Sequence, residues 1–81
     1  MKSVIQQIVE LLGRHQRAGA TRRFTELDLA EELGLNFDDV RIAVAMMGDQ
    51  GLLAGRREGD AVVFELSEKG LAEYARYRRG A

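Results

Sequence analysis

Two arginine clusters are the residues of this 81-residue sequence best suited to binding a ligand. The first comprises Arg14, Arg17, Arg22 and Arg23, and the second is the pair Arg56 and Arg57. Guanidinium groups bind phosphate through parallel hydrogen bonds, so both clusters are candidates for contacts to a nucleic-acid backbone. The alternative for each is an ordinary solvated loop or turn, with nearby acidic residues partly cancelling the charge.

The charged residues are unevenly distributed, although the formal net charge is only −1. Residues 1–23 carry five basic groups and one acidic group, whereas residues 24–50 carry one basic and seven acidic groups. Residues 51–81 are close to balanced, with six basic and five acidic groups. Duplex binding usually draws on clustered lysine and arginine, so the two ends are better suited to DNA than the acidic middle.

Other chemistries find little support in the sequence. It has no cysteine and a single histidine, His15, which is flanked by basic residues and is expected at the surface. The neighbouring Asp38 and Asp39 suit helix capping better than cation binding. No nucleophile with its base, phosphate-cradling loop or metal-ligand set can be assembled, so we expect neither enzyme activity nor a metal or other cofactor.

Helix-capping patterns divide the first half of the chain into three expected helices. Ser3 and Gln6 form a capping-box pattern that opens the first helix, and residues 14–23 read as a basic connection ending the helical pattern. Thr25 with Asp28 forms a second capping box, and residues 24 and 29 suit a hydrophobic staple. Gly34 suits a left-handed helix end, and Asn36 suits the cap of a third helix.

The second half of the chain predicts a β-hairpin followed by a last helix. The third helix should bury a stripe formed by Val40, Ala43, Val44 and Met47. After Gly51 the apolar residues alternate, which predicts strands at residues 52–57 and 61–66 joined by a turn drawn from residues 56–60. Ser67 should cap the last helix, in which Tyr74 packs in the core. The expected N-terminal helix has neither a signal-peptide core nor a membrane span, which suggests a cytoplasmic protein.

This order of elements resembles the winged helix-turn-helix family of DNA-binding domains, with features similar to MarR-like and PadR-like regulators. The segment 30–36, Ala-Glu-Glu-Leu-Gly-Leu-Asn, resembles the turn of a helix-turn-helix, and Gly51-Leu52-Leu53 resembles the entry to a wing. Leu66 to Gly70 is similar to the junction after the wing. The resemblance implies an α+β fold, mostly α, comprising three helices, a two-stranded wing and a C-terminal helix, in a single domain over residues 1–81.

What the resemblance implies about function is a small transcriptional regulator, expected as a homodimer, with its third helix in the major groove of duplex DNA and its wing against the backbone. Asn36 and Arg41 should face outward and suit base edges or phosphates. The expected DNA contacts are Arg22, Arg23, Asn36, Arg41, Arg56 and Arg57.

The rest of the outward face predicted for the third helix is a poor match to DNA and leaves a second interpretation open. Asp38 and Asp39 would stand near phosphates, and an apolar strip occupies positions where polar groups are usual. The strip comprises Phe37, Ile42, Ala45 and Met46. Contiguous exposed apolar residues mark partner surfaces, so this face suits docking onto another protein or a second copy. A helical phase shifted by one residue would instead place part of the strip in the core.

Overall fold

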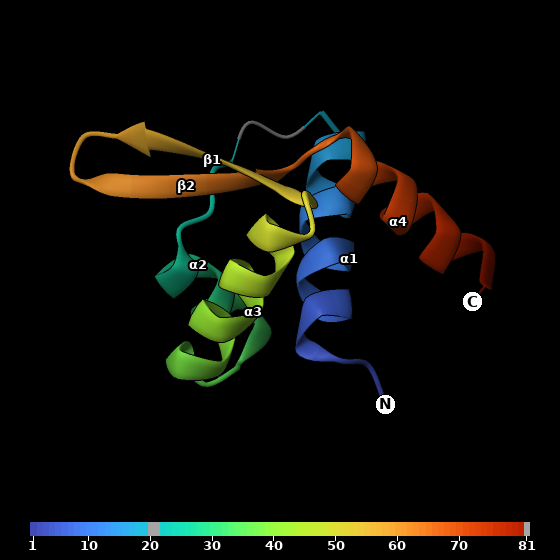
Figure 1. The fold of residues 1–81 in the computed structure, drawn as a ribbon, viewed down its shortest axis with the longest axis horizontal. Helices are drawn as coiled ribbons and strands as arrows, with labels where there is room; N and C mark the ends of the chain where they lie inside the picture. The colour runs from blue at the N-terminus through green and yellow to red at the C-terminus, as the bar shows by residue number, and fades with distance from the viewer. Residues whose placement is uncertain (20–21, 81) are drawn as a thin grey trace.

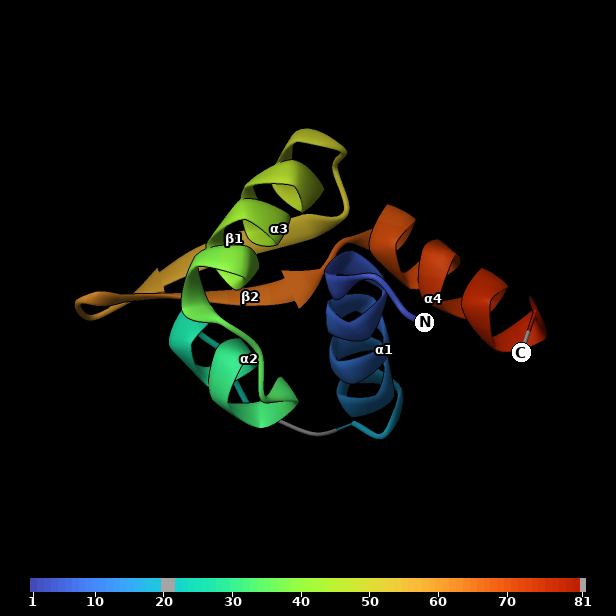
Figure 2. The ribbon, with the colours of Figure 1, turned by 90° about the horizontal axis from the view of Figure 1, so that it is seen from below.

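Four helices and a two-stranded hairpin make up the computed structural model, which describes residues 1–19 and 22–80. In chain order the elements are α1 (Val4–Arg17), α2 (Glu26–Leu33), α3 (Phe37–Asp49), β1 (Leu53–Glu58), β2 (Ala61–Leu66) and α4 (Glu68–Gly80). Helix α1 stands in the middle, with α2 and α3 on one side and α4 on the other (Figures 1 and 2). The hairpin projects past α2 and α3 as a wing.

Helix α1 is longer than the sequence pattern predicts. The Ser3 hydroxyl accepts a hydrogen bond from the backbone N–H of Gln6 at 3.0 Å, as expected for the cap. The helix then continues to Arg17, so the prediction that a connection begins at Arg14 is wrong. No glycine or proline interrupts residues 14–17, and basic side chains in a last turn interact favourably with the helix dipole. The predicted connection also includes residues 20 and 21, which lie outside the described residues.

The turn between α2 and α3 has the geometry that the sequence predicts. Both bonds of the capping box form: the Thr25 hydroxyl accepts from Asp28 N–H at 3.1 Å, and the Asp28 carboxylate accepts from Thr25 N–H at 3.0 Å. The backbone N–H of Thr25 is the main reason that the pKa of Asp28 lies below its usual value. Gly34 ends α2 with φ +65°, and Asn36 caps α3 by accepting from Asp38 N–H at 2.8 Å.

The two strands pair antiparallel through a shorter turn than predicted. The turn consists of Gly59 and Asp60 alone, with φ +63° at the glycine, while Arg56, Arg57 and Glu58 belong to β1. Of residues 56–60, from which the prediction draws the turn, only Gly59 and Asp60 form it, and Arg56 and Arg57 lie in the strand that the sequence also predicts for them. A glycine with positive φ at the first position makes a two-residue turn possible, and this leaves both arginines free to continue the strand pairing.

A single cluster of buried side chains joins all the helices to the hairpin. Its fully enclosed members come from the first three helices and the segment before α2: Phe24, Ile8, Leu12, Leu29, Met47, Val9 and Val40. The hairpin and α4 add the buried residues Leu66 and Tyr74. Helices α1 and α4 cross closely at Gly13, where a Cβ atom would lie only 2.3 Å from the ring of Tyr74. Tyr74 is 5% exposed, which confirms its predicted place in the core.

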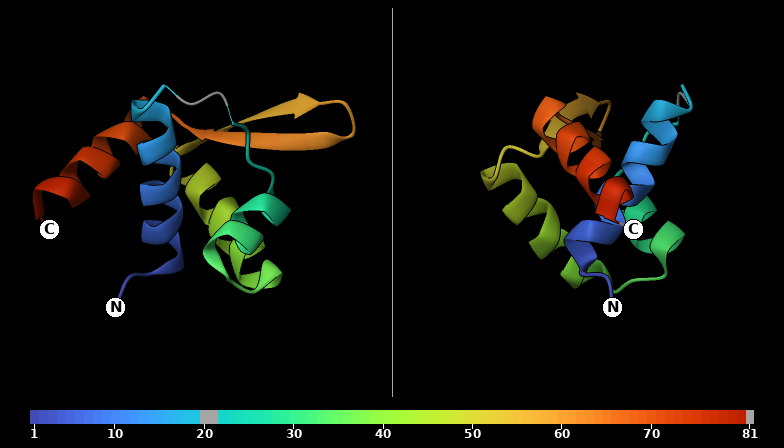
Figure 3. Two further views of the ribbon diagram at one scale, coloured as in Figure 1. Left: turned by 180° about the vertical axis from the view of Figure 1, so that it is seen from behind. Right: turned by 90° about the vertical axis from the view of Figure 1, so that its right-hand side faces the viewer.

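The segment before α2 is tied to the wing by a short β-bridge between Phe24 and Phe64, in which Phe64 N–H donates to the Phe24 carbonyl at 2.8 Å. From behind, this segment can be followed across the hairpin (Figure 3). The side-chain amide of Gln16 adds a second link, because it donates to the carbonyl of Leu66 at 3.3 Å and accepts from Leu66 N–H at 2.7 Å.

The base of the wing is fastened to the first turn of α4, a feature we call the wing-base junction, formed by residues 50–52 and 67–70. Ser67 donates from its backbone to Leu52 O at 3.0 Å and from its hydroxyl to Gly51 O at 2.5 Å. The same hydroxyl caps α4 by accepting from Gly70 N–H at 3.1 Å. At Gly70 a Cβ atom would lie 2.2 Å from the Leu52 carbonyl oxygen, so the two segments touch through backbone.

The order of elements, the helix-turn-helix and the hairpin confirm the predicted winged helix-turn-helix fold. Within the described residues no helix has both the length and the apolar character needed to cross a lipid bilayer.

Candidate nucleic-acid interface

The outward face of α3 has the phase that the sequence predicts. The stripe of Val40, Ala43, Val44 and Met47 is buried, and the residues between these positions are exposed. Ile42 is 61% exposed, Met46 46% and Phe37 40%, and Ala45 is exposed as well. The alternative in which a shifted phase hides part of this strip in the core is therefore wrong.

The polar residues of the α3 face offer few groups for reading bases. The side-chain oxygen of Asn36 is engaged in its own helix cap, which leaves the amide N–H groups as donors. Arg41 is exposed, and its guanidinium carbon lies 5.9 Å from the centre of the Phe37 ring. Asp38 and Asp39 occupy the exposed first turn, where they stabilise the helix but repel phosphate.

The two wing arginines point to opposite faces of the hairpin. Arg57 lies opposite Val62, in the register that also places Phe64 and Leu66 against the core, while Arg56 lies opposite Val63 on the other face. Arg57 therefore extends on the side of the wing that covers α2 and α3, beyond the edge of the core. It has no ion-pair partner within the described residues.

Arg56 instead belongs to a three-residue cluster that the sequence does not predict. One carboxylate oxygen of Glu58 lies 2.8 Å from the Arg56 Nη2 atom and 2.9 Å from the Arg23 Nε atom. We call these three residues the Arg23–Glu58–Arg56 cluster. Arg56 and Glu58 are two apart on one strand and so share a face, which a longer predicted strand would have shown. Arg23 is distant in the sequence, and the β-bridge between its neighbour Phe24 and Phe64 holds it beside the hairpin.

The remaining basic residues near α1 have separate surroundings. Arg22 pairs with Glu32 at 3.2 Å, and its guanidinium carbon lies 4.6 Å from the centre of the Phe24 ring. His15 packs edge-on against the same ring at 5.0 Å and is half-buried, so it is less exposed than its sequence context suggests. Arg14 and Arg17 are exposed on the last turns of α1.

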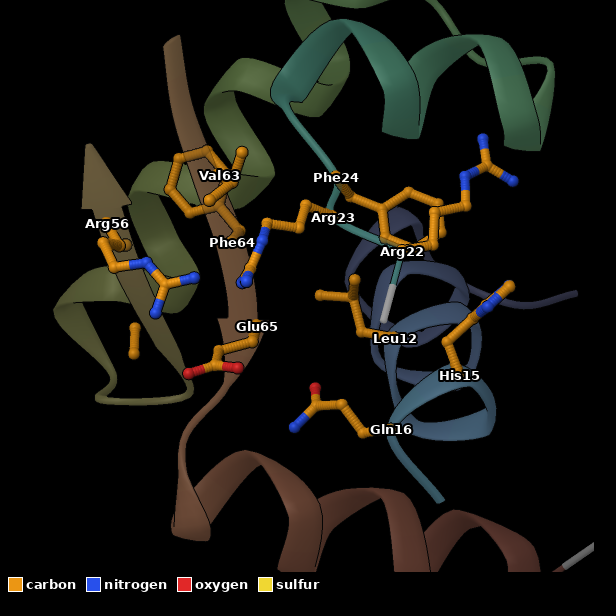
Figure 4. Close-up of a pocket in the computed structure, with 12 residues that line it drawn as sticks. Leu12, His15, Gln16, Arg22, Arg23, Phe24, Arg56, Val63, Phe64 and Glu65 are labelled. Atoms are coloured by element: carbon orange, nitrogen blue, oxygen red, sulfur yellow. The ribbon is translucent and has the colours of Figure 1, made fainter. Parts of the chain in front are cut away.

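Arg23 and Arg56, the two arginines of the Arg23–Glu58–Arg56 cluster, line a cavity of about 460 Å³ between the end of α1 and the hairpin. In Figure 4, the side chains of Arg23 and Arg56 point toward one another beside the hairpin, while Leu12 and Gln16 project toward them from α1. The other lining residues are His15, Arg22, Phe24, Ala54, Gly55, Val63, Phe64 and Glu65.

A second, shallower groove of about 290 Å³ lies between the start of α1 and α3. Its lining is mostly apolar and includes Ile42 and Met46 from the exposed strip, together with Val4, Ile5 and Ala43. Residues 1–19 and 22–80 contain no cluster of three histidine, cysteine, aspartate or glutamate residues able to hold a metal ion.

Comparison with known proteins adds a family and a set of similar folds. A family model described as PaaX-like protein matches residues 2–70. No curated protein matches the chain.

Among solved structures, the adhesin competence repressor AdcR of Streptococcus pyogenes superposes with a TM-score of 0.80 at 23% identity, over 99% of this chain and 56% of AdcR. Lactococcus lactis ZitR superposes with a TM-score of 0.78 at 21% identity, over 98% of this chain and 51% of ZitR. A Ralstonia eutropha protein provisionally described as DNA-binding superposes with a TM-score of 0.78 at 17% identity, over 95% of this chain and 96% of that protein.

At these identities the likeness establishes the fold, which is that of a winged helix. The chain spans about half the length of AdcR and ZitR.

Proposed function

This chain belongs to the PaaX-like protein family, and from that membership and its winged-helix fold we propose that it is a DNA-binding transcriptional regulator. AdcR is a repressor by name, and the Ralstonia eutropha protein is provisionally described as DNA-binding, which supports this assignment. A regulator of this kind needs no catalytic site and works in the cytoplasm on duplex DNA. We further propose that it acts as a homodimer, because paired half-sites are the usual target of helix-turn-helix proteins.

The observation that carries the proposal is the position of Arg57 relative to α3. The side of the wing that bears Arg57 is also the side that covers α3, so a duplex lying along α3 meets Arg41 from the helix and Arg57 from the wing. Asn36 adds amide donors at the helix start. Most of the affinity would come from phosphate contacts, because the remaining α3 face is acidic or apolar.

Arg22, Arg23 and Arg56 contribute less in this arrangement. Each already has a carboxylate partner, and Arg56 lies on the opposite face of the wing from Arg57. We propose that these three add positive potential near the duplex rather than direct contacts.

Arg57→Ala, compared with Arg56→Ala, tests this assignment. Removing one phosphate contact lowers the slope of log affinity against log salt concentration by about 0.9 in magnitude. We expect that loss for Arg57→Ala and a much smaller change for Arg56→Ala, measured by fluorescence anisotropy on a mixed-sequence duplex at several salt concentrations. Equal changes in the two variants would reject the role of Arg57, and a wild-type chain without salt-sensitive duplex binding would reject the proposed function.

A second candidate function is a protein-interaction module that uses the α3 face. The specific observation in its favour is the exposed apolar strip, in which Phe37, Ile42, Ala45 and Met46 stand where a DNA reader normally carries polar groups. The neighbouring apolar groove extends this surface toward the start of α1.

A further inference from the structure

We propose that Ile42 and Ala45, at the centre of the outward face of α3, read DNA by packing against the methyl groups of thymine in the major groove. Thymine presents a methyl group there, whereas the other unmodified bases present only hydrogen-bonding groups. An apolar side chain gains nothing from a phosphate but is stabilised by covering a methyl group. The inference rests on the proposed function and deepens it, because it names the base feature that this chain distinguishes.

The positions of the two residues on the helix carry the inference. With about 3.6 residues per turn, Ile42 and Ala45 fall in line with one another, directly opposite the stripe that α3 buries in the core. Ile42 is 61% exposed, so a branched apolar side chain projects from the side on which a recognition helix approaches the bases. Ala45, almost one turn later, is exposed and small, which allows the helix to approach closely.

The charged residues around this centre place bases rather than phosphates beside it. Arg41 lies at one border of the face, and Arg57 extends on the same side of the molecule from the wing. Both can bind phosphates beside a groove. Asp38 is in line with Ile42 and Ala45, and phosphate would repel it, but in the groove its carboxylate can accept from the amino group of cytosine. Apolar and acidic groups along the middle of the face therefore suit the edges of pyrimidines.

The size of the apolar strip also favours DNA over a protein partner. The strip has four members, and exposed charged residues of the same helix interrupt it. A standard protein interface engages about 20–30 residues on each side. One methyl group, by contrast, needs only one or two apolar side chains to cover it. The strip is thus of a size suited to base contacts.

Replacing thymine by uracil tests the proposal, because it removes the methyl group and leaves base pairing and backbone charge unchanged. The probes are a mixed-sequence duplex rich in A·T pairs and the same duplex with uracil at every thymine position. We expect the chain to bind the thymine duplex about 4–15-fold more tightly, as burial of one or two methyl groups predicts. The slope of log affinity against log salt concentration should be the same for both duplexes, since no phosphate contact is lost.

Fluorescence anisotropy over several salt concentrations distinguishes the possible results. Salt-sensitive binding of equal affinity to both duplexes would overturn the inference while the proposed function stands, and the strip would then be available to a protein partner. A chain without salt-sensitive binding to either duplex would reject the proposed function and the inference together. As a complement, 5-methylcytosine in place of cytosine in a G·C-rich duplex should raise the affinity, because it adds the same methyl group to the groove.

Two variants assign the methyl contact to α3. Ile42→Ala should reduce the ratio of the thymine and uracil affinities severalfold. Leu27→Ala should leave that ratio unchanged, because it removes an apolar side chain of similar exposure, 55%, from α2. Thermal melts establish that both variants are folded. A folded Ile42→Ala chain with the full wild-type ratio, or a Leu27→Ala chain that loses it, would show that the methyl groups are read elsewhere.

Discussion

At the scale of single residues, neighbours in the sequence can have unrelated surroundings. Arg56 and Arg57 are consecutive, yet strand alternation directs one to the Arg23–Glu58–Arg56 cluster and the other to the side of the wing that covers α3. A variant that removes both arginines therefore mixes two effects. The single substitutions separate them, because one affects an ion pair and the other an exposed cation.

Asp28 provides a residue-scale prediction about pH. Its pKa is lowered in the folded state, mainly by the Thr25 backbone N–H, so its ionised form stabilises the fold above the pKa of the unfolded chain. That contribution is lost as the pH falls through the lower, folded-state value. Asp28→Asn should therefore reduce the free energy of unfolding by about 0.5 kcal/mol at neutral pH, and the difference should shrink as the pH falls below about 4.

Urea unfolding of the wild type and of Asp28→Asn, from neutral pH to below about pH 4, measures the effect. Glu31→Gln is the matched control, because it removes an exposed carboxylate of the same helix without touching the cap. A difference between Asp28→Asn and the wild type that stays constant down to the lowest pH would contradict the assignment.

At the scale of elements, the close contact between α1 and α4 requires glycine, which has no side chain, at position 13. At Gly13 the nearest atoms to an added Cβ belong to the Tyr74 ring, at 2.3–2.7 Å, and a buried ring cannot move aside without disturbing the core. Gly13→Ala should therefore lower the free energy of unfolding by about 1–3 kcal/mol, although alanine is the better helix former.

Gly48→Ala is its matched control. Gly48 lies in α3 with no heavy atom within 4 Å of an added Cβ, so alanine should stabilise the chain by about 0.5–1 kcal/mol. Chemical unfolding of the two variants under the same conditions should thus give shifts of opposite sign. Two stabilising shifts would mean that α1 and α4 are not in close contact in solution.

The elements that the sequence predicts correctly are those whose determinants lie close together in the chain. Thr25 with Asp28, Gly34 and Asn36 act within a few residues, and the structure has them in their predicted roles. The predicted end of helix α1 and the predicted start of the hairpin turn differ from the structure, because the alternative boundaries there differ by little in local energy. The pairing of Gln16 with Leu66 could not be predicted, since it joins residues 50 positions apart.

The candidate site likewise has some features that the local sequence predicts and others that depend on the tertiary fold. Exposure of Asn36, Arg41 and the α3 strip follows from helical periodicity, which the sequence displays. The cluster around Glu58 and the adjoining cavity depend on how the segment before α2 lies against the wing. That arrangement is a product of the tertiary fold and has no local pattern.

At the scale of the whole molecule, the two candidate functions assign the α3 face to different partners, and one double variant distinguishes them. Ile42→Glu with Met46→Glu places two charges on an exposed surface, so the fold should be retained. If the strip docks onto a protein or a second copy, the variant should lose that complex in sedimentation velocity and in pull-down. If the strip faces DNA, duplex affinity should fall instead, because two carboxylates are added beside the phosphates.

Ile42→Gln with Met46→Gln is the matched control, since it removes apolar surface without adding charge. Loss of a protein complex in both variants would favour the interaction module. Loss of duplex affinity only in the glutamate variant would favour DNA. An assembly state and duplex affinity that are both unchanged in the glutamate variant would contradict a functional role for the strip.

The wing-base junction has a mechanical consequence. The end of α3, the first residues of the wing and the first turn of α4 are connected by backbone contact at Gly70 and by the hydrogen bonds of Ser67 and Lys69, the latter to the Gln50 carbonyl at 2.8 Å. Because no side chain separates Gly70 from the Leu52 carbonyl, the two backbone segments have little room to move relative to one another. Because α4 also packs on α1 through the buried Tyr74, a partner that shifts the first turn of α4 on α1 would shift the base of the wing with it.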